Sequence, residues 1–140
     1  MVNFWDTSAV VPLLVREADT DAREEQFRGV SGMVTWWATR VECVSALCRR
    51  EREGRLSVAA VHAAFRRLES FGDQWMVVSP SEVMLPRAER LLRVHPLRAA
   101  DAMQLAAALL ATRENTKNSC FFTADKNLAD AARKEGFTVL

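Results

Sequence analysis

The sequence predicts a three-layer α/β domain in which helices cover both faces of a mainly parallel sheet of about four or five strands. Short apolar runs alternate along the chain with segments of helical periodicity, which is typical of strand–helix–strand units. Two of these runs are followed by an aspartate, at Asp6 and Asp125, and ligands of open α/β sheets gather at the carboxyl ends of the strands. Because the chain has 140 residues, we expect residues 1–140 to form a single domain.

The composition is that of an ordinary globular protein, with 49% hydrophobic and 26% charged residues. The net charge is +1, so any contact with nucleic acid must come from local patches. The three cysteines include no CxxC pair, which argues against a disulfide framework and a zinc site. We find no signal peptide and no apolar run approaching the roughly 18 residues that span a bilayer, and therefore expect a cytoplasmic protein without a membrane segment.

The first half of the chain begins with an apolar strand that ends at Asp6. Gly54 ends a long helical segment, and Ser57 is a good N-cap for the helix that follows. The two helices predict a helical hairpin at about 36–71. The expected elements are helices at 9–16 and 19–28, a strand at 33–35, and helices at 36–53 and 57–71.

The second half alternates in the same way. Pro86 lies inside one helical segment and predicts a kink or a late start. Another helix has Gln104 as its only polar residue between Ala102 and Ala111, so we expect it to be buried nearly all round. The expected elements are strands at 75–78, 120–123 and 137–140, and helices at 81–93, 97–113 and 126–135.

Four carboxylates stand out from their surroundings. Asp6 and Asp125 follow strands, so a parallel sheet places both at one edge. Asp101 lies near the start of the buried helix, and Glu42 shares a helix stripe with small residues. Each has a simpler explanation: Asp6 would serve as a helix cap, and Glu42 as a boundary residue on a solvated face.

Several carboxylates at one site need compensation. Two unit charges about 4 Å apart repel by about 4 kcal/mol at an effective dielectric constant near 20, and a whole domain is stable by only about 5–15 kcal/mol. Protonation, arginine partners such as Arg40 and Arg98, or a cation would each relieve this repulsion. A site of oxygen ligands suits Mg²⁺ or Mn²⁺, and this is the more economical interpretation.

The order of these motifs resembles that of PIN-domain ribonucleases, specifically the VapC-like toxins of type II toxin–antitoxin pairs. Together the matching stretches span nearly the whole chain, and they are specific through their order rather than individually. They are residues 4–9 (Phe-Trp-Asp-Thr-Ser-Ala), 39–42 (Thr-Arg-Val-Glu), 97–106 (Leu-Arg-Ala-Ala-Asp-Ala-Met-Gln-Leu-Ala), 122–125 (Phe-Thr-Ala-Asp) and 128–129 (Leu-Ala).

The resemblance implies a PIN-like fold and a metal-dependent endoribonuclease that hydrolyses RNA with a metal-activated water. It implies an acidic quartet of Asp6, Glu42, Asp101 and Asp125 as catalytic residues and ligands of Mg²⁺ or Mn²⁺. Ser8 and Thr123 would support these carboxylates or their waters. Candidate RNA-binding residues are Arg40, Arg49 and Arg98.

The resemblance also implies partners. A cognate VapB-like antitoxin would inhibit the enzyme, and the apolar face of the second hairpin helix is a candidate docking surface, although an ordinary buried face explains the same pattern. A homodimer is expected for the family. The residues of that candidate face are Val58, Val61, Phe65 and Leu68.

Two other functions are compatible with an aspartate after the first strand. Phosphoaspartate phosphatases also begin with an aspartate after the first strand, but they use a second acid two residues later, where this chain has Ser8. A catalytically silent PIN-like module that binds RNA or protein stays open as the alternative, because retention of four acids does not prove turnover.

Overall fold

The computed structural model describes all of residues 1–140 and contains one sheet of five parallel strands in the order β3-β2-β1-β4-β5. The predicted fold class is confirmed. The first strand of the chain takes the central position, with β2 and β4 as its neighbours. The strands are β1 (Asn3–Trp5), β2 (Val34–Trp36), β3 (Met76–Val78), β4 (Cys120–Phe122) and β5 (Thr138–Val139).

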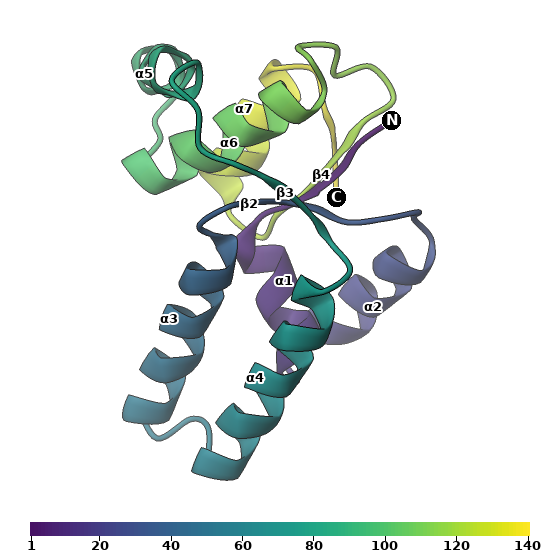
Figure 1. Cartoon of the computed structure of the whole chain (residues 1–140), viewed down its shortest axis with the longest axis vertical. Coiled ribbons are helices and arrows are strands. Elements are labelled where there is room, and N and C mark those ends of the chain that lie inside the picture. Colours follow the sequence, from purple (N-terminus) through teal and green to yellow (C-terminus); the bar gives the residue numbers. More distant parts are fainter.

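Helices cover both faces of this sheet (Figure 1). The helices α5, α6 and α7 lie on one face, and α1, α2, α3 and α4 lie on the other. Their bounds are α1 (Thr7–Leu14), α2 (Thr20–Arg28), α3 (Thr39–Arg52), α4 (Val58–Gly72), α5 (Met84–Val94), α6 (Ala99–Ala111) and α7 (Lys126–Lys134).

The neighbouring strands β1 and β4 supply an aromatic pair to each face, because successive side chains of a strand point to opposite sides. Phe4 stacks on Phe121 with ring centroids 5.3 Å apart, in the core shared with α5, α6 and α7. Trp5 stacks on Phe122 at 4.1 Å, in the core shared with α1, α3 and α4. The strands β1 and β4, which precede Asp6 and Asp125 along the chain, are therefore packed between two hydrophobic cores.

The helical hairpin exists as α3 and α4, but its start was predicted too early. Trp36 belongs to β2, where it pairs with Val78, and the backbone N–H of Trp37 still donates to the Val78 carbonyl. Helix α3 begins at Thr39. Strand pairing outweighed the helical pattern because two consecutive tryptophans suit a strand at least as well as a helix.

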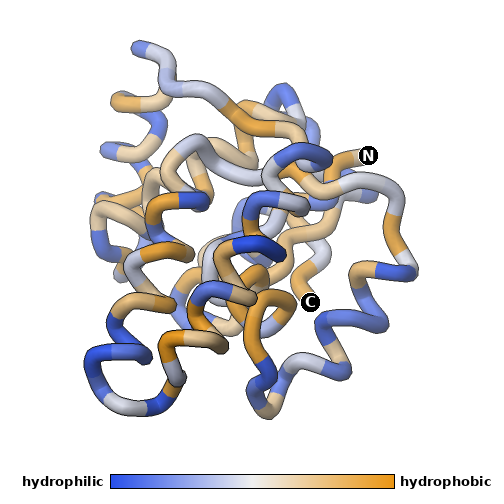
Figure 2. The backbone as a smooth tube through the Cα atoms, turned by 60° about the horizontal axis from the view of Figure 1, so that its bottom comes forward, coloured by the Kyte–Doolittle hydropathy of each residue, from blue (hydrophilic) through white to orange (hydrophobic).

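The periodicity of the remaining helices is visible in Figure 2, where hydrophobic and hydrophilic residues alternate along the helical turns. Helix α5 begins at Met84, which places Pro86 in its first turn and satisfies the predicted late start. All three cysteines are free thiols. No helix is both long enough and apolar enough to cross a membrane.

Candidate functional site

The four predicted carboxylates line one cleft at the carboxyl edge of the sheet. Asp6 directly follows β1 and Asp125 lies three residues after the end of β4, while Asp101 lies in the first turn of α6 and Glu42 in that of α3. The cleft has a volume of about 400 Å³. Elements from both faces of the sheet thus meet at the edge where ligands of open α/β sheets bind.

Asp6 uses its two carboxylate oxygens differently. Its Oδ2 accepts hydrogen bonds from the Ser8 backbone N–H (3.3 Å), the Ser8 hydroxyl and the Thr123 hydroxyl (2.9 Å). Its Oδ1 has no hydrogen-bond partner, although the residue is only 5% exposed. Asp6 is therefore the N-cap of α1, as the simpler interpretation holds, and still offers one free oxygen to the cleft.

Ser8 and Thr123 join the ends of β1 and β4. The Ser8 hydroxyl accepts a bond from the Ala124 backbone N–H (2.9 Å), and the Thr123 hydroxyl accepts one from the Asp125 N–H (3.1 Å). The two hydroxyl oxygens lie 3.1 Å apart. Asp125 is exposed and caps α7 by accepting the Leu128 N–H at 2.8 Å. The two hydroxyls thus hold the Asp6 carboxylate and the backbone of residues 124–125 in a fixed relative position.

Glu42 is held by polar groups from two other helices. The Thr7 hydroxyl donates to Glu42 Oε2 (3.3 Å), and the Gln104 amide nitrogen lies 3.2 Å from Oε1 and 3.5 Å from Oε2. Thr7 belongs to α1 and Gln104 to α6. The carboxylate is therefore anchored between the layers.

Burial and mutual repulsion raise the pKa of three of these carboxyl groups. For Asp6 burial is the main cause, opposed by the hydrogen bonds from Ser8 and Thr123, and Asp101 adds repulsion. For Glu42 burial again leads, followed by repulsion from Asp6. The pKa of Asp101 is raised by burial and then by Asp125. For all three groups burial is the largest cause, and repulsion from a neighbouring carboxylate adds to it.

Arginine pairing does not relieve this charge. No salt bridge in the chain involves any of the four carboxylates. Arg98 attracts Asp101 and lowers its pKa, but less than burial raises it. Arg40 lies on the side of α3 that faces α4, beside Gly72 and Trp75. The ion-paired cluster considered for Arg40 and Arg98 is therefore not formed.

The donor set suits a hard divalent cation. The free Oδ1 of Asp6 and the neighbouring carboxylates are all oxygen ligands, which is the ligand type that hard divalent cations prefer. No group of three or more acidic, histidine or cysteine side chains converges closely enough to hold an ion directly. Mg²⁺ commonly uses one or two carboxylates and completes its shell with water, so the arrangement fits such a site.

Arg23 takes part in the site and was not predicted. Arg23 is 7% exposed, and its guanidinium donates to the Thr123 backbone carbonyl (2.9 Å) and to Gln26 (3.0 Å). Burial lowers its pKa, while Asp19 and then Asp6 oppose this shift. The charged stretch around Arg23 resembles any solvated helix, so the sequence carries no signal for this role.

The far end of the cleft is lined by charged groups that were only partly predicted. Arg49 and Arg50 reach it from α3, and Glu17 and Asp19 from the α1–α2 connection. Arg50 pairs with Glu17 at 2.7 Å, whereas Arg49 has no acidic partner. Of the candidate RNA-binding arginines, only Arg49 lines the same cleft as the carboxylates.

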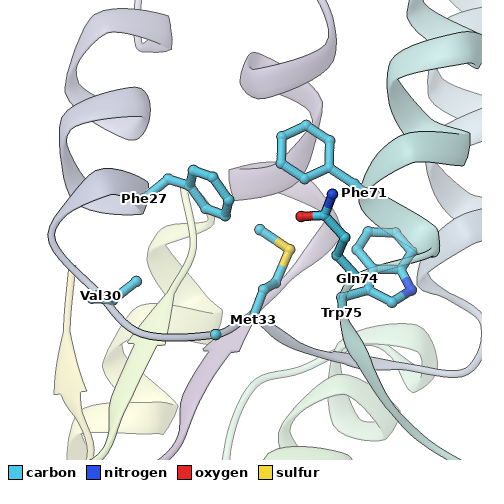
Figure 3. Close-up of a pocket in the computed structure, with 7 residues that line it drawn as sticks. Phe27, Val30, Met33, Phe71, Gln74 and Trp75 are labelled. Atoms are coloured by element: carbon cyan, nitrogen blue, oxygen red, sulfur yellow. The ribbon is translucent and has the colours of Figure 1, made fainter.

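A second, apolar cavity of about 220 Å³ lies away from these residues (Figure 3). Phe27, Met33 and Phe71 point toward one another there, and Gln74 and Trp75 complete the wall. The rings of Phe27 and Phe71 meet edge to face at 5.3 Å. None of the four carboxylates lines this cavity, so it offers no acid–base or metal chemistry.

Solved structures share the fold at low sequence identity. FitAcB from Neisseria gonorrhoeae matches with a TM-score of 0.69 and 14% identity, covering 100% of this chain and 96% of that one. PAE2754 from Pyrobaculum aerophilum gives 0.66 and 19%, with 99% and 89% covered. A toxin–antitoxin complex from Klebsiella pneumoniae gives 0.65 and 16%, with 91% and 90% covered. No curated protein sequence matches significantly.

The family model described as PIN domain matches residues 4–134. This match includes all four carboxylates, both supporting hydroxyls and every helix of the fold. The chain belongs to the PIN-domain family.

Proposed function

We propose that this protein is a Mg²⁺- or Mn²⁺-dependent endoribonuclease, the toxin of a toxin–antitoxin pair. PIN domains are generally nucleases, and the family match covers nearly the whole chain. The observation that carries the proposal is the cleft itself, which is lined by Asp6, Glu42, Asp101 and Asp125. None of these four carboxylates has a salt-bridge partner, and Asp6 keeps its Oδ1 free of hydrogen bonds. Such a cleft suits a cation and the phosphodiester that the cation would contact.

The carboxylates of the cleft and their supporting hydroxyls have different roles in the proposed reaction. Asp6 Oδ1 and Asp101 would hold the cation, with Asp125 binding directly or through water. When bound, Mg²⁺ or Mn²⁺ supplies positive charge against the phosphodiester and lowers the pKa of a nearby water. Glu42 would orient that water and accept its proton, for which a raised carboxyl pKa is favourable. Ser8 and Thr123 keep Asp6 in place.

RNA binding is assigned first to Arg49. It follows Glu42 by seven residues, about two helical turns, so the two side chains share a face of α3 roughly 10.5 Å apart along the axis. That spacing suits a phosphate one or two nucleotides from the cleaved bond. Arg98 would assist beside Asp101, whereas Arg40 lines a separate groove between α3 and α4. The expected products carry 5′-phosphate and 3′-hydroxyl ends.

An antitoxin partner is supported by the matched structure of a toxin–antitoxin complex. The docking face expected on α4 is smaller than its sequence pattern indicates, because Val61 and Leu68 are buried inside the chain. Val58, at 58% exposure, and part of Phe65 stay accessible. We also propose a homodimer and a cytoplasmic location, both on the basis of the family resemblance.

The alternative is a catalytically silent PIN-like module that binds RNA or a protein. Retention of all four carboxylates and of the hydroxyls that orient Asp6 favours the enzyme. Such a module would bind RNA through Arg49 without depending on Asp6 or Asp101. The two functions therefore differ in one measurable property, the appearance of new RNA ends.

Mapping RNA 5′ ends after induced expression separates the two. The wild type should produce new 5′-phosphate ends at recurrent sites, and Asp6→Ala should produce none. Asp130→Ala is the matched control, because Asp130 is exposed and pairs only with Arg133. If Asp6→Ala gives the same ends as the wild type, the proposed function is wrong.

A further inference from the structure

Gln104 is a buried polar residue in a helix that is otherwise apolar at this depth. It is 1% exposed, and its neighbours from Ala102 to Leu109 on the buried side of α6 are alanines and leucines. Such a helix needs no amide to pack against the sheet, since an apolar side chain of similar volume would fill the same space. The amide therefore calls for an explanation beyond packing.

Its contacts reach across the edge of the sheet. Gln104 belongs to α6 on one face, yet its Nε2 lies 3.1 Å from the Thr7 hydroxyl, 3.2 Å from the Thr39 hydroxyl and 3.2 Å from Glu42 Oε1. These partners belong to α1 and α3 on the other face. A single amide group thus joins three helices, and two of its partners, Thr7 and Glu42, line the cleft.

The hydrogen bonding of this amide is unbalanced. Nε2 carries two hydrogens but has four acceptor atoms within 3.5 Å, two of them on Glu42. The other end, Oε1, is buried without any partner, which is unfavourable for folding. The side chain therefore directs its donor group at Thr7, Thr39 and Glu42 while its acceptor oxygen stays unpaired.

We propose that Gln104 is a positioning residue that holds the Glu42 carboxylate toward the cleft, together with the Thr7 hydroxyl. Glu42 is only half-buried, and a glutamate side chain has three rotatable bonds that would otherwise let it turn into solvent. The Gln104 amide nitrogen and the Thr7 hydroxyl both contact the Glu42 carboxylate, at 3.2 Å from Oε1 and 3.3 Å from Oε2, and thereby favour the orientation that faces the cleft. An effect of Gln104 on RNA cleavage rests on the proposed function, whereas the contact between Gln104 and Glu42 does not depend on it.

The contact is tested without any activity measurement by NMR of the Gln104 side-chain amide. Its two N–H protons should exchange slowly in the wild type, and their resonances should move in Glu42→Gln. In Glu51→Gln, which changes an acid on α3 outside the cleft, they should stay in place. Rapid exchange in the wild type, or resonances unaffected by Glu42→Gln, would overturn the proposal even if the protein is an active nuclease.

The positioning role is tested by a double-mutant cycle on Mn²⁺-dependent RNA cleavage and on Mn²⁺ affinity. Gln104→Met keeps the length and removes both donors, and it should lower cleavage by about 10–100-fold, the usual effect of losing a group that orients a ligand. In a Glu42→Gln background the same substitution should have no further effect. The matched control is Gln74→Met, which changes an exposed glutamine at the apolar cavity.

Independent losses that multiply in the double variant would show that Gln104 does not act through Glu42. A cleavage rate unchanged in Gln104→Met would show that Gln104 has no positioning role. Either result would overturn the proposal. Thermal unfolding of each variant accompanies the cycle. A wild type that does not cleave RNA refutes the proposed function. The NMR comparison of the wild type with Glu42→Gln still tests whether Gln104 contacts Glu42.

Discussion

The Thr123 hydroxyl donates a 2.9 Å hydrogen bond to Asp6 Oδ2, and this bond connects the carboxyl ends of two neighbouring strands. Thr123 is itself held by Arg23, which donates to its carbonyl at 2.9 Å. The arrangement occupies one oxygen of Asp6 and leaves the other free. Positioning of the first carboxylate therefore depends on residues separated by more than a hundred positions in sequence.

Replacement of Thr123 by valine should weaken metal binding while the fold persists. The substitution keeps the β-branched shape and removes one donor to Asp6 and one acceptor for the Asp125 N–H. We expect about 10–100-fold lower Mn²⁺ affinity by calorimetry and a loss of stability of about 1–3 kcal/mol. Thr138→Val, on an exposed position of β5, should leave affinity unchanged.

Asp6→Asn should stabilise the metal-free protein at neutral pH. Burial raises the Asp6 pKa above its unfolded value, so between these two pKa values the native state binds more protons than the unfolded state. The free energy of unfolding of the wild type therefore falls as pH rises through that range, and asparagine removes this fall while remaining a good N-cap. Thermal unfolding at pH 7 should show a higher Tm for the variant.

The same gain should vanish in acid. Below about pH 4, the ordinary pKa of an aspartate, the carboxyl group is protonated in both the native and the unfolded state. Wild type and Asp6→Asn should then unfold at similar temperatures. A variant that is less stable than the wild type at pH 7 would show that the Asp6 charge is compensated within the chain.

Addition of Mn²⁺ should raise the Tm of the wild type. A cation that binds only the native state at 100 times its Kd stabilises it by about 2.7 kcal/mol. Asp101→Asn should reduce this gain strongly, and Asp130→Asn, which alters an exposed acid paired with Arg133, should retain it. Equal gains in both variants would place the ion elsewhere.

Arg49→Gln should weaken RNA binding by the protein through loss of one phosphate contact. In a salt titration of single-stranded RNA affinity, we expect the slope of log K against log salt to fall by about 0.7. Arg40→Gln should change it less, because Arg40 lies in the groove between α3 and α4. Both measurements use the Asp6→Asn background, so that the RNA is not cleaved. A larger effect of Arg40→Gln would place the RNA on the other side of α3.

The fold and the shared cleft of the carboxylates could be predicted because short local patterns in the sequence identify them. An apolar run that stops on an acid, as at Asp6 and near Asp125, directly reports the carboxyl end of a buried strand. The helix that contains Asp101 is almost entirely apolar, and this composition indicates that the helix is buried. Each of these apolar patterns lies within about ten residues of the carboxylate whose position it predicts.

The rest of the site depends on contacts between distant segments. Gln104 reaches Glu42 and Thr7, and Arg23 reaches Thr123, across separations of 62 to 100 residues that no local pattern encodes. The position of Arg40 was predictable in principle, because two residues before Glu42 correspond to about 200° around the helix. Trp36 was misplaced because its strand partner, Val78, lies 42 positions further along the chain.

The most direct test of the central claim is the Mn²⁺-dependent cleavage rate of a defined RNA by the purified protein, compared with Asp6→Asn from the same preparation. Loss of several kcal/mol of charge stabilisation corresponds to a rate loss of more than about hundredfold. We predict cleavage by the wild type and by Asp130→Asn, and a loss of that size in Asp6→Asn. Equal rates for the wild type and Asp6→Asn would contradict the assignment of the cleft as a metal-dependent nuclease site.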